Sequence, residues 1–286
     1  MHRSRIMRRS YIQILSTVLS NSYILGFFKG QIYTGKTKFI CTPGLNCYSC
    51  PGAIGSCPIG SLQAVLGGRS FNFSYYVFGL MMLFGVVLGR FICGFLCPFG
   101  FLQDLLYKIK TPKLKIKKKF DEPLRFLKYL VLIIPAIILP IFLTNEFGTA
   151  QPFFCQWICP AGTLEGGIPL LIKNEWLRKM VGFLFNWKLF LLVLTIVGSV
   201  LIYRPFCKYI CPLGAFYSIF NKLSFYQMII EKNKCNGCKA CERACNMQVE
   251  VTKDCNSIEC IRCGDCKKAC PKGAISSSFN MKFKNQ

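Results

Sequence analysis

Residues 235–245 read CNGCKACERAC and residues 260–271 read CIRCGDCKKACP, so the spacing C-x2-C-x2-C-x3-C occurs twice. Three closely spaced thiolates can wrap one face of a cubane iron–sulfur cluster, while a fourth, farther along the chain, ligates the other cluster of a pair. Pro271 directly follows the last cysteine, as this pattern requires. The two runs therefore predict two [4Fe–4S] clusters.

Each predicted cluster takes three cysteines from one run and one from the other. One set is Cys235, Cys238, Cys241 and Cys270, and the other is Cys245, Cys260, Cys263 and Cys266. Structural zinc is the alternative for paired CxxC motifs, but two complete four-cysteine runs favour clusters. Cys255 fits neither run and is expected to be an ordinary thiol. We expect residues 221–286 to form a small α+β domain of the 2[4Fe–4S] bacterial-ferredoxin type.

The composition indicates that the rest of the chain lies in a membrane. The 286 residues are 52% hydrophobic and only 17% charged, which is too apolar for an ordinary soluble protein. One histidine, His2, leaves no pair of imidazole ligands for haem b, so no haem is expected. The net charge of +24 is accompanied by no nucleic-acid motif and is explained by membrane orientation, so no nucleic-acid partner is expected.

Four apolar stretches approach the roughly 20 residues that cross a bilayer. They cover residues 11–28, 71–91, 124–143 and 181–203. Pro135 and Pro140 predict a kink in the third stretch. The first stretch contains Gln13, Asn21 and three serines, and a surface-lying amphipathic helix is its alternative. Residues 1–220 are thus expected to form an α-helical membrane domain with four transmembrane helices.

Basic residues predict how these helices are oriented. Four arginines, Arg3, Arg5, Arg8 and Arg9, precede the first stretch, and the segment 108–119 between the second and third reads KIKTPKLKIKKK. Positive loops remain in the cytoplasm. With four spans both termini are cytoplasmic in a multi-pass cell-membrane protein. Residues 29–70 and 144–180 then face outward, and residues 92–123 and those after 204 face the cytoplasm.

A second cysteine motif occurs in four copies, each of which ends in Cys-Pro-x-Gly. The copies are CPGAIGSCPIG at 50–60, CGFLCPFG at 93–100, CQWICPAG at 155–162 and CKYICPLG at 207–214. Three of them have C-x3-C spacing, which suits ligation of one metal centre, and the proline and glycine allow a tight turn before a new helix. By the predicted topology, copies one and three face outward and copies two and four face the cytoplasm.

Copies on the same side supply four thiolates each, as in an inverted repeat. The inner set is Cys93, Cys97, Cys207 and Cys211, and the outer set is Cys50, Cys57, Cys155 and Cys159, with one [4Fe–4S] cluster expected for each. Disulfides outside and ordinary buried thiols inside are the alternatives. Cys41 and Cys47 are additional outer thiols. Cys47 and Cys50 form a CxxC pair that could be a redox dithiol, or Cys47 could replace Cys50 as a ligand.

The motifs CGFLCPFG and CKYICPLG, the four spans and the tandem ferredoxin motif resemble the membrane polyferredoxin family that includes NapH, MauN, NosR and CcoG. The resemblance covers nearly the whole chain. It implies a cytoplasm-facing carrier that exchanges electrons with quinones or partner redox proteins, with iron–sulfur clusters at the paired CxxxCP motifs. The inner set and the eight ferredoxin cysteines correspond position by position. The outer set departs from the NapH pattern, and we infer an outward-facing electron exit from that departure.

The expected function is transmembrane electron transfer by a non-catalytic subunit of an oxidoreductase system. Electrons would pass from a cytoplasmic low-potential donor, such as a soluble ferredoxin or flavodoxin, to a quinone or an extracytoplasmic redox protein. The basic segments could steer an acidic donor or contact anionic lipid. Two alternatives remain open: a transmembrane thiol–disulfide reductant that uses the outer CxxC pair, and an iron–sulfur assembly or regulatory protein.

Overall fold

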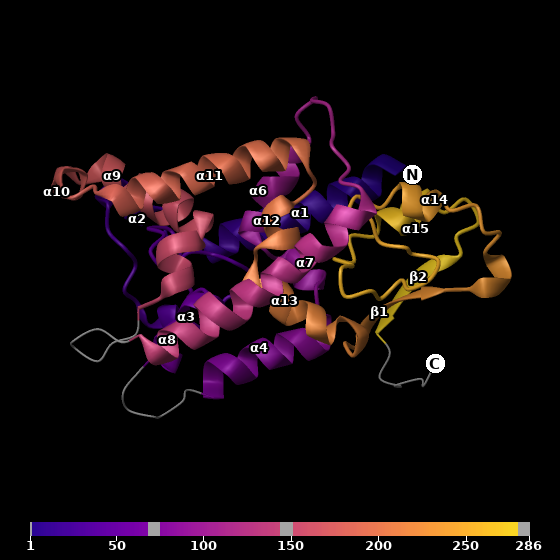
Figure 1. Ribbon diagram of the computed structural model, residues 1–286, viewed down its shortest axis with the longest axis horizontal. Helices are drawn as coiled ribbons and strands as arrows, with labels where there is room; N and C mark the ends of the chain where they lie inside the picture. Colours follow the sequence, from indigo (N-terminus) through magenta and orange to yellow (C-terminus); the bar gives the residue numbers. More distant parts are fainter. Residues whose placement is uncertain (1, 68–74, 144–150, 280–286) are drawn as a thin grey trace.

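The computed structural model describes residues 2–67, 75–143 and 151–279, and it consists mainly of helices that run along the long axis of the molecule (Figure 1). The long helices are α1 (His2–Ser20), α4 (Tyr75–Leu88), α7 (Lys118–Ile133) continued through η2 (Ile134–Ile138) into α8 (Leu139–Phe142), and α11 (Phe183–Leu201). The C-terminal module lies at one end of this bundle, beside the start of α1.

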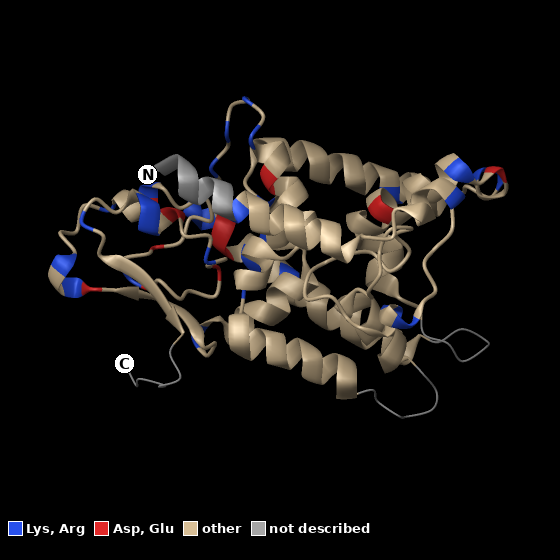
Figure 2. Cartoon of the chain, turned by 180° about the vertical axis from the view of Figure 1, so that it is seen from behind, with Lys and Arg blue, Asp and Glu red and all other residues tan. Residues whose placement is uncertain are grey.

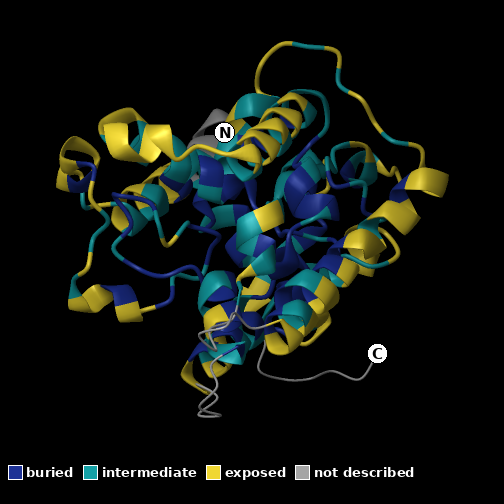
Figure 3. Cartoon of the chain, turned by 60° about the vertical axis from the view of Figure 1, so that its left-hand side comes forward, coloured by how far each residue is buried: buried dark blue, intermediate teal, exposed yellow. Residues whose placement is uncertain are grey.

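Two helices among the described residues are long and apolar enough to cross a membrane, Lys118–Phe142 and Phe183–Leu201. The shorter helix α4 is also apolar, but the predicted second span begins in residues outside the described ranges. The faces that α11 turns outward are apolar, since Phe190, Val193, Leu194 and Val197 are exposed. Figure 3 shows the buried residues gathered between the helices and the exposed ones on their outer faces. A lipid environment suits such faces.

The predicted apolar stretch 11–28 is not one helix. Helix α1 ends at Ser20 and a short helix α2 (Leu25–Lys29) follows. Asn21 occupies the break, where its side-chain amide donates to the carbonyl of Thr17 at 3.1 Å. In the third stretch the α-helix widens into the π-helical segment η2 around Pro135, because proline has no backbone N–H to donate and must be accommodated locally.

Short helices inside the bundle begin at the Cys-Pro-x-Gly motifs. They include α3 (Pro58–Leu66), α6 (Pro98–Tyr107) and α13 (Pro212–Ile219), while α5 (Phe91–Phe95) and α12 (Pro205–Tyr209) carry the first cysteines of copies two and four. At the third motif η3 (Phe154–Ile158) and η4 (Gly162–Gly167) are π-helical. In each of the three α-helices the cysteine is the N-cap and proline takes the first helical position, where its missing N–H costs nothing.

The end of the bundle opposite the C-terminal module is built from loops and short helices. These are α2, η1 (Lys36–Phe39), α9 (Ile168–Lys173) and α10 (Glu175–Lys179). Charged residues gather at the two ends of the molecule and in the loop between α6 and α7, and α4 carries none (Figure 2). This distribution is the one expected for a protein with a membrane-embedded middle.

The C-terminal module is a small α+β unit, as predicted. It contains η5 (Phe220–Lys222), β1 (Tyr226–Ile230), η6 (Lys232–Lys234), α14 (Ala240–Arg243), α15 (Asp265–Ala269) and β2 (Ile275–Phe279). The strands pair antiparallel, with Tyr226 opposite Phe279 and Ile230 opposite Ile275. Its buried residues, Met228 and Ile261 among them, belong to the same hydrophobic cluster as those of the helix bundle. The module therefore packs against the bundle through a continuous core.

Candidate iron–sulfur sites

Two pockets in the C-terminal module are lined by the two crossed cysteine sets that the spacing predicts. One pocket is lined by Cys235, Cys238, Cys241 and Cys270 together with Ile230 and Ile275. The other is lined by Cys245, Cys260, Cys263 and Cys266 together with Met247 and Val251. Four thiols around an apolar pocket are the donor set of a cubane cluster. We name these the distal and proximal pockets, because the second lies nearer the bundle.

The same backbone geometry shapes both three-cysteine loops. Gly237 and Lys239 in the first run, and Arg262 and Gly264 in the second, have left-handed conformations with φ between 53° and 80°. These are equivalent positions of the two runs. Arg262 holds this conformation although it has a side chain, and its guanidinium donates to the carbonyls of Leu88, at 3.0 Å, and Asn221. The second loop is thus fixed to the bundle by the residue that shapes it.

Backbone amides donate to three thiol sulfurs of the module. Val249 N–H donates to Cys245 at 3.5 Å, Arg262 N–H to Cys260 at 3.4 Å, and Ala274 N–H to Cys270 at 3.4 Å. Such bonds stabilise negative charge on cluster sulfurs. Cys255 also lines the proximal pocket, but its thiol donates to the carbonyl of Met228 at 3.0 Å.

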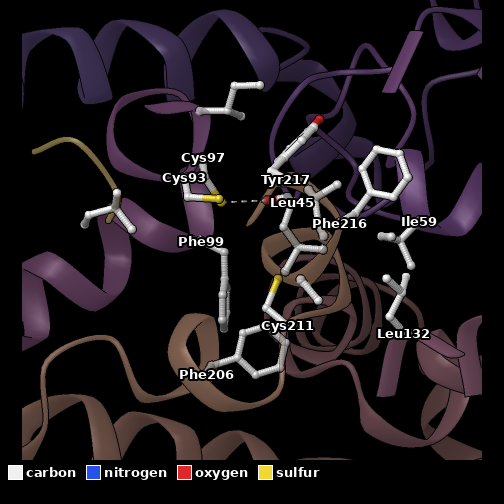
Figure 4. Packing of buried hydrophobic residues seen from close by; sticks show 14 of the residues in the cluster. Leu45, Ile59, Cys93, Cys97, Phe99, Leu132, Phe206, Cys211, Phe216 and Tyr217 are labelled. Atoms are coloured by element: carbon white, nitrogen blue, oxygen red, sulfur yellow. Dashed lines mark hydrogen bonds between the residues drawn. The ribbon is translucent and has the colours of Figure 1, made fainter. Parts of the chain in front are cut away.

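The inner set is formed by two motifs that cap helices α6 and α13. Gly100 N–H donates to Cys97 Sγ at 3.3 Å and Gly214 N–H to Cys211 Sγ at 3.4 Å. Figure 4 shows Cys97 and Cys211 among Leu45, Phe99, Phe206 and Tyr217. Burial raises the pKa of the Cys97 thiol, and the nearby sulfurs of Cys207 and Cys93 raise it further. Thiols that are buried in this way lose their protons only when a cation takes the place of the protons. A metal centre provides such a cation.

Two buried arginines join the halves of the inner set reciprocally. Arg90 and Arg204 each stand three residues before the first cysteine of their motif. Arg204 donates to the carbonyl of Cys93, and Arg90 donates to the carbonyl of Cys207 at 3.3 Å. A β-carbon at Gly100 would lie 3.0 Å from the Cys93 carbonyl oxygen, so the glycine leaves room for this approach.

Each arginine has a buried carboxylate partner. Arg204 makes a two-point ion pair with Asp104 at 2.7 and 2.6 Å, and Arg9 also contacts Asp104 at 2.7 Å. Burial alone would raise the pKa of Asp104, but Arg204 and Arg9 lower it to about 2. Arg90 pairs at 2.8 Å with Glu259, which also contacts Lys128 of α7. Glu259 directly precedes Cys260 of the proximal pocket, so this network links the module to the inner set.

The outer thiols gather around Cys47 where we expected Cys50. A β-carbon at Gly60 would lie 3.8 Å from Cys155 Sγ, and one at Gly162 would lie 3.8 Å from Cys47 Sγ. Burial raises the pKa of Cys155 well above its usual value, and the neighbouring sulfurs that raise it further are those of Cys159, Cys57 and Cys47. Cys47 thus lies near Cys57, Cys155 and Cys159.

The side chain of Cys50 and the backbone of Cys41 have other partners. The thiol of Cys50 donates to the side-chain oxygen of Asn21 at 3.4 Å. Cys41 forms an isolated β-bridge with Ser56. The CxxC spacing allowed either Cys47 or Cys50 to be the ligand, and the break between α1 and α2 places Asn21 beside Cys50.

Polar residues that the sequence reasoning missed accompany the outer set. Glu165 accepts from the backbone N–H of Cys47 at 2.6 Å, and Lys188 donates to the carbonyl of Cys155 at 3.1 Å. Burial raises the pKa of Glu165 to about 7. Glu165 stands six residues after Cys159, and Gln63 and Gln103 stand at the same place after Cys57 and Cys97. Comparison of the motifs beyond their glycines could have identified this position.

Two close contacts bring the cysteine sets next to one another. A β-carbon added to Gly94 of the inner motif would overlap the carbonyl oxygen of Ile261, which directly follows Cys260 of the proximal pocket. A β-carbon added to Gly44 would lie 2.7 Å from the α-carbon of Cys97. The loop that carries Gly44 reaches Cys47 only three residues later, so it connects the inner and outer sets directly.

The donor sets fit clusters better than single ions. Within residues 2–67, 75–143 and 151–279, no three His, Cys, Asp or Glu side chains converge as a single metal ion would require. The thiols of the module instead surround pockets, and amide donors face several sulfurs. These are features of cubane sites.

Comparison with known proteins agrees with this assignment. A family model described as a 4Fe-4S binding domain, Fer4_5, matches residues 73–121, 128–188 and 184–232, and a second, Fer4, matches residues 256–276. Each Fer4_5 match contains one C-x3-C-P motif, and the Fer4 match contains the second ferredoxin run up to its last cysteine. The chain therefore binds [4Fe–4S] clusters.

Similar proteins come from archaea and bacteria. The uncharacterized protein MJ0750 of Methanocaldococcus jannaschii is 35% identical over 71% of this chain and 78% of its own length. MJ0749 of the same organism is 31% identical over 72% of each chain. Regulatory protein NosR of Stutzerimonas stutzeri is 27% identical over 61% of this chain but only 22% of its own length. No solved structure matches the chain.

Proposed function

Since the chain belongs to the Fer4_5 family of 4Fe–4S binding proteins, we propose that it carries electrons across a membrane through four [4Fe–4S] clusters. A cytoplasmic low-potential donor reduces the ferredoxin module, and a quinone or an extracytoplasmic redox protein accepts the electrons. The proposed ligands are the distal, proximal, inner and outer sets, with Cys47 in the outer set. The observation that carries the proposal is the unbroken series of contacts from the exposed distal cysteines to the outer set.

The electron path follows from these contacts. Cys235 and Cys238 are exposed, so the distal cluster is the entry point. Cys241 of the distal set and Cys266 of the proximal set are close enough to interact electrostatically. The proximal set meets the inner motif where Ile261 contacts Gly94. Gly44 to Cys47 spans at most about 11 Å of extended chain, so the inner and outer sets are also neighbours.

The proposed membrane placement has four spans with both termini in the cytoplasm. Helices α1, α4, α7 with α8, and α11 lie along one axis, and the start of α1 lies beside the ferredoxin module (Figure 1). The basic loop between α6 and α7 lies toward the same end, as cytoplasmic loops require. Residues 1–220 then form the membrane domain and residues 221–286 the cytoplasmic ferredoxin domain.

An acidic soluble donor fits the entry point. Lys232, Lys234 and Lys239 flank the exposed thiols of the distal set and are themselves exposed. Positive charge around an electron-entry site raises the encounter rate with a negatively charged carrier. A soluble ferredoxin or flavodoxin has this chemistry and is the donor that we propose.

The chain's own residues hold and insulate the electron path. The clusters supply the one-electron chemistry when bound. The arginine pairs fix both halves of the inner set, amide donors stabilise charge on the sulfurs, and buried aromatic residues such as Phe99 and Phe206 exclude water. An inside-negative membrane favours outward electron movement by about 2.3 kcal/mol per 100 mV if the full field is crossed.

The alternative of a thiol–disulfide reductant needs Cys47 and Cys50 to act as a pair. In the structure Cys47 lies with the other outer thiols while Cys50 donates to Asn21. The observed positions therefore favour ligation by Cys47. The other alternative, an assembly or regulatory protein, gains no specific support from the described residues.

Electron transfer into sealed vesicles tests the proposal. The purified protein is reconstituted as the sole protein, with the ferredoxin module on the outside and oxidised cytochrome c trapped within. Reduced flavodoxin added outside should reduce the trapped cytochrome c, and faster when valinomycin and potassium ions dissipate the charge that develops. Protein-free vesicles give the background rate. The proposal fails if flavodoxin reduces the ferredoxin clusters but the trapped cytochrome stays oxidised.

A further inference from the structure

Two glutamines occupy the same place in the first two copies of the Cys-Pro-x-Gly motif. The copies read CPIGSLQ at 57–63 and CPFGFLQ at 97–103, so Gln63 and Gln103 each stand six residues after the motif's last cysteine. Both side chains are completely buried. Amides at such positions must have partners, because burying an unpaired polar group is costly.

Each glutamine donates to the first cysteine of the motif opposite its own. Gln103 Nε2 lies 3.0 Å from Cys207 Sγ in the inner set, and Gln63 Nε2 lies 3.7 Å from Cys155 Sγ in the outer set. The relation is the same in both cases, from copy two to copy four and from copy one to copy three. A correspondence repeated at two separate sites points to a role in the sites themselves.

The orientation of both amides is fixed by a second contact. Gln103 Nε2 also donates to the carbonyl of Phe99 at 3.4 Å, and Gln63 Nε2 donates to the carbonyl of Ile59 at 3.4 Å. A backbone carbonyl can only accept a hydrogen bond, so the NH2 group of each glutamine must face that carbonyl. The remaining N–H is therefore directed at the sulfur, and the side-chain oxygens of both glutamines have no partner.

The other two copies place different groups at the equivalent position. Glu165 of the third copy accepts from the backbone N–H of Cys47 at 2.6 Å, and Tyr217 of the fourth donates to the carbonyl of Pro43 at 2.9 Å. Neither hydrogen-bonds to a thiol there. A side-chain amide that donates to sulfur is thus specific to one motif of each pair, in addition to the backbone amides that donate to Cys97 and Cys211.

We propose that Gln103 and Gln63 are positioning residues that raise the reduction potentials of the inner and outer clusters, respectively. The inference rests on the proposed clusters at these sets. A hydrogen bond to a ligating sulfur stabilises the more negative, reduced cluster over the oxidised one. The step is transfer of one electron to the cluster, and no proton moves and no covalent bond changes. Loss of the donor lowers the potential of that cluster alone.

The test is redox titration of the anaerobically purified holoprotein, monitored by electron paramagnetic resonance, for wild type, Q103L and Q63L. Q103L should lower the inner-cluster equilibrium constant for reduction about tenfold, which is about 59 mV for one electron. Q63L should shift the outer cluster in the same direction by less, because its contact is longer. Q227L removes a half-buried glutamine of the ferredoxin module whose side chain donates to the carbonyl of Lys222, and it should shift no potential.

The outcomes separate this proposal from the proposed function. Wild-type protein without inner and outer signals contradicts the cluster sites themselves. Full iron content with an unchanged inner potential in Q103L overturns only the role of Gln103. If Q103L fails to load iron, Q103M provides a second test, because it retains the side-chain volume without the hydrogen-bond donor. If Q103M and Q103L both lose the inner cluster, Gln103 is required for assembly and the potential-setting role is overturned.

Discussion

The inner and outer sets are built from equivalent motifs but are held in place by different forces. Buried ion pairs fix the inner set: Arg204 with Asp104, and Arg90 with Glu259 of the ferredoxin module. The outer set has a long loop, the carboxylate of Glu165 and one lysine contact from α11. The inner set is therefore tied to the rest of the chain by ion pairs, whereas the outer set is held by single hydrogen bonds from Glu165 and Lys188. Substitutions should break them differently.

The largest expected effect comes from replacing Cys47. C47S removes a proposed outer ligand, so the outer cluster should be lost. The iron content should then fall by about four of the about 16 iron atoms per chain. Transfer to trapped cytochrome c should cease while the ferredoxin clusters still accept electrons. Iron analysis and the vesicle assay measure both effects.

C50S is the matched control for this prediction. Cys50 stands three residues away and is buried, and its thiol contacts Asn21. Its replacement should leave the iron content and the transfer rate unchanged. Loss of the outer cluster in C50S but not in C47S would restore the assignment first expected from the repeat.

Removal of Asp104 should destabilise the inner region most strongly. D104A leaves the buried guanidinium of Arg204 without its carboxylate partner, which costs about 3–5 kcal/mol of unfolding free energy. Thermal unfolding in detergent should show a lower midpoint and loss of the inner cluster. D254A, which removes an exposed partner of Lys222, should change stability by about 1 kcal/mol or less.

The same pair gives a pH dependence with a definite sign. The pKa of Asp104 is lowered to about 2 in the folded protein, below about 3.9 for an unfolded chain. Its contribution to stability is therefore complete above about pH 4 and declines as the pH falls toward 2. The difference in midpoint between wild type and D104N should stay constant from about pH 8 to 5 and shrink below about 4. A difference that grows on acidification would contradict the pairing.

A smaller effect is expected at the junction of module and bundle. In G94A the new β-carbon meets the carbonyl of Ile261, so the module must shift, at a cost of about 1–3 kcal/mol. Stopped-flow reduction should show normal entry into the ferredoxin clusters but slower reduction of the inner cluster. G79A is the control, because a β-carbon there meets nothing within 4 Å. Equal rates in G94A and wild type would place the transfer route elsewhere.

The smallest effect is expected at the distal entry. Replacing Lys232, Lys234 and Lys239 with glutamate should slow association with an acidic donor about tenfold at low salt, since electrostatic steering acts on the encounter. The difference should fade as the ionic strength rises. Stopped-flow reduction by flavodoxin at several salt concentrations measures it. A salt-independent rate would argue against an acidic donor.

The sequence alone predicted the sites whose ligands are adjacent in the chain. The ferredoxin runs gave both crossed sets, because the spacing itself determines which thiols can surround a pocket. We paired Cys93 and Cys97 with Cys207 and Cys211 because the expected topology places both motifs on the same side of a membrane. Both results need only local geometry and topology.

Features that depend on distant contacts could not be predicted in this way. The pair of Arg90 with Glu259 joins residues 169 positions apart, and no local spacing indicates it. The position of the Cys50 thiol depends on where α1 ends, since Asn21 at that break accepts from it. Packing of the folded chain, and not the motif, determines such contacts.

Cluster content tests the central claim most directly. Iron and acid-labile sulfide are measured on anaerobically purified wild-type protein. Four cubane clusters predict about 16 iron atoms and about 16 sulfides per chain, and about 12 would remove the outer cluster. A value of about eight, which corresponds to the ferredoxin module alone, would contradict an electron path across the membrane.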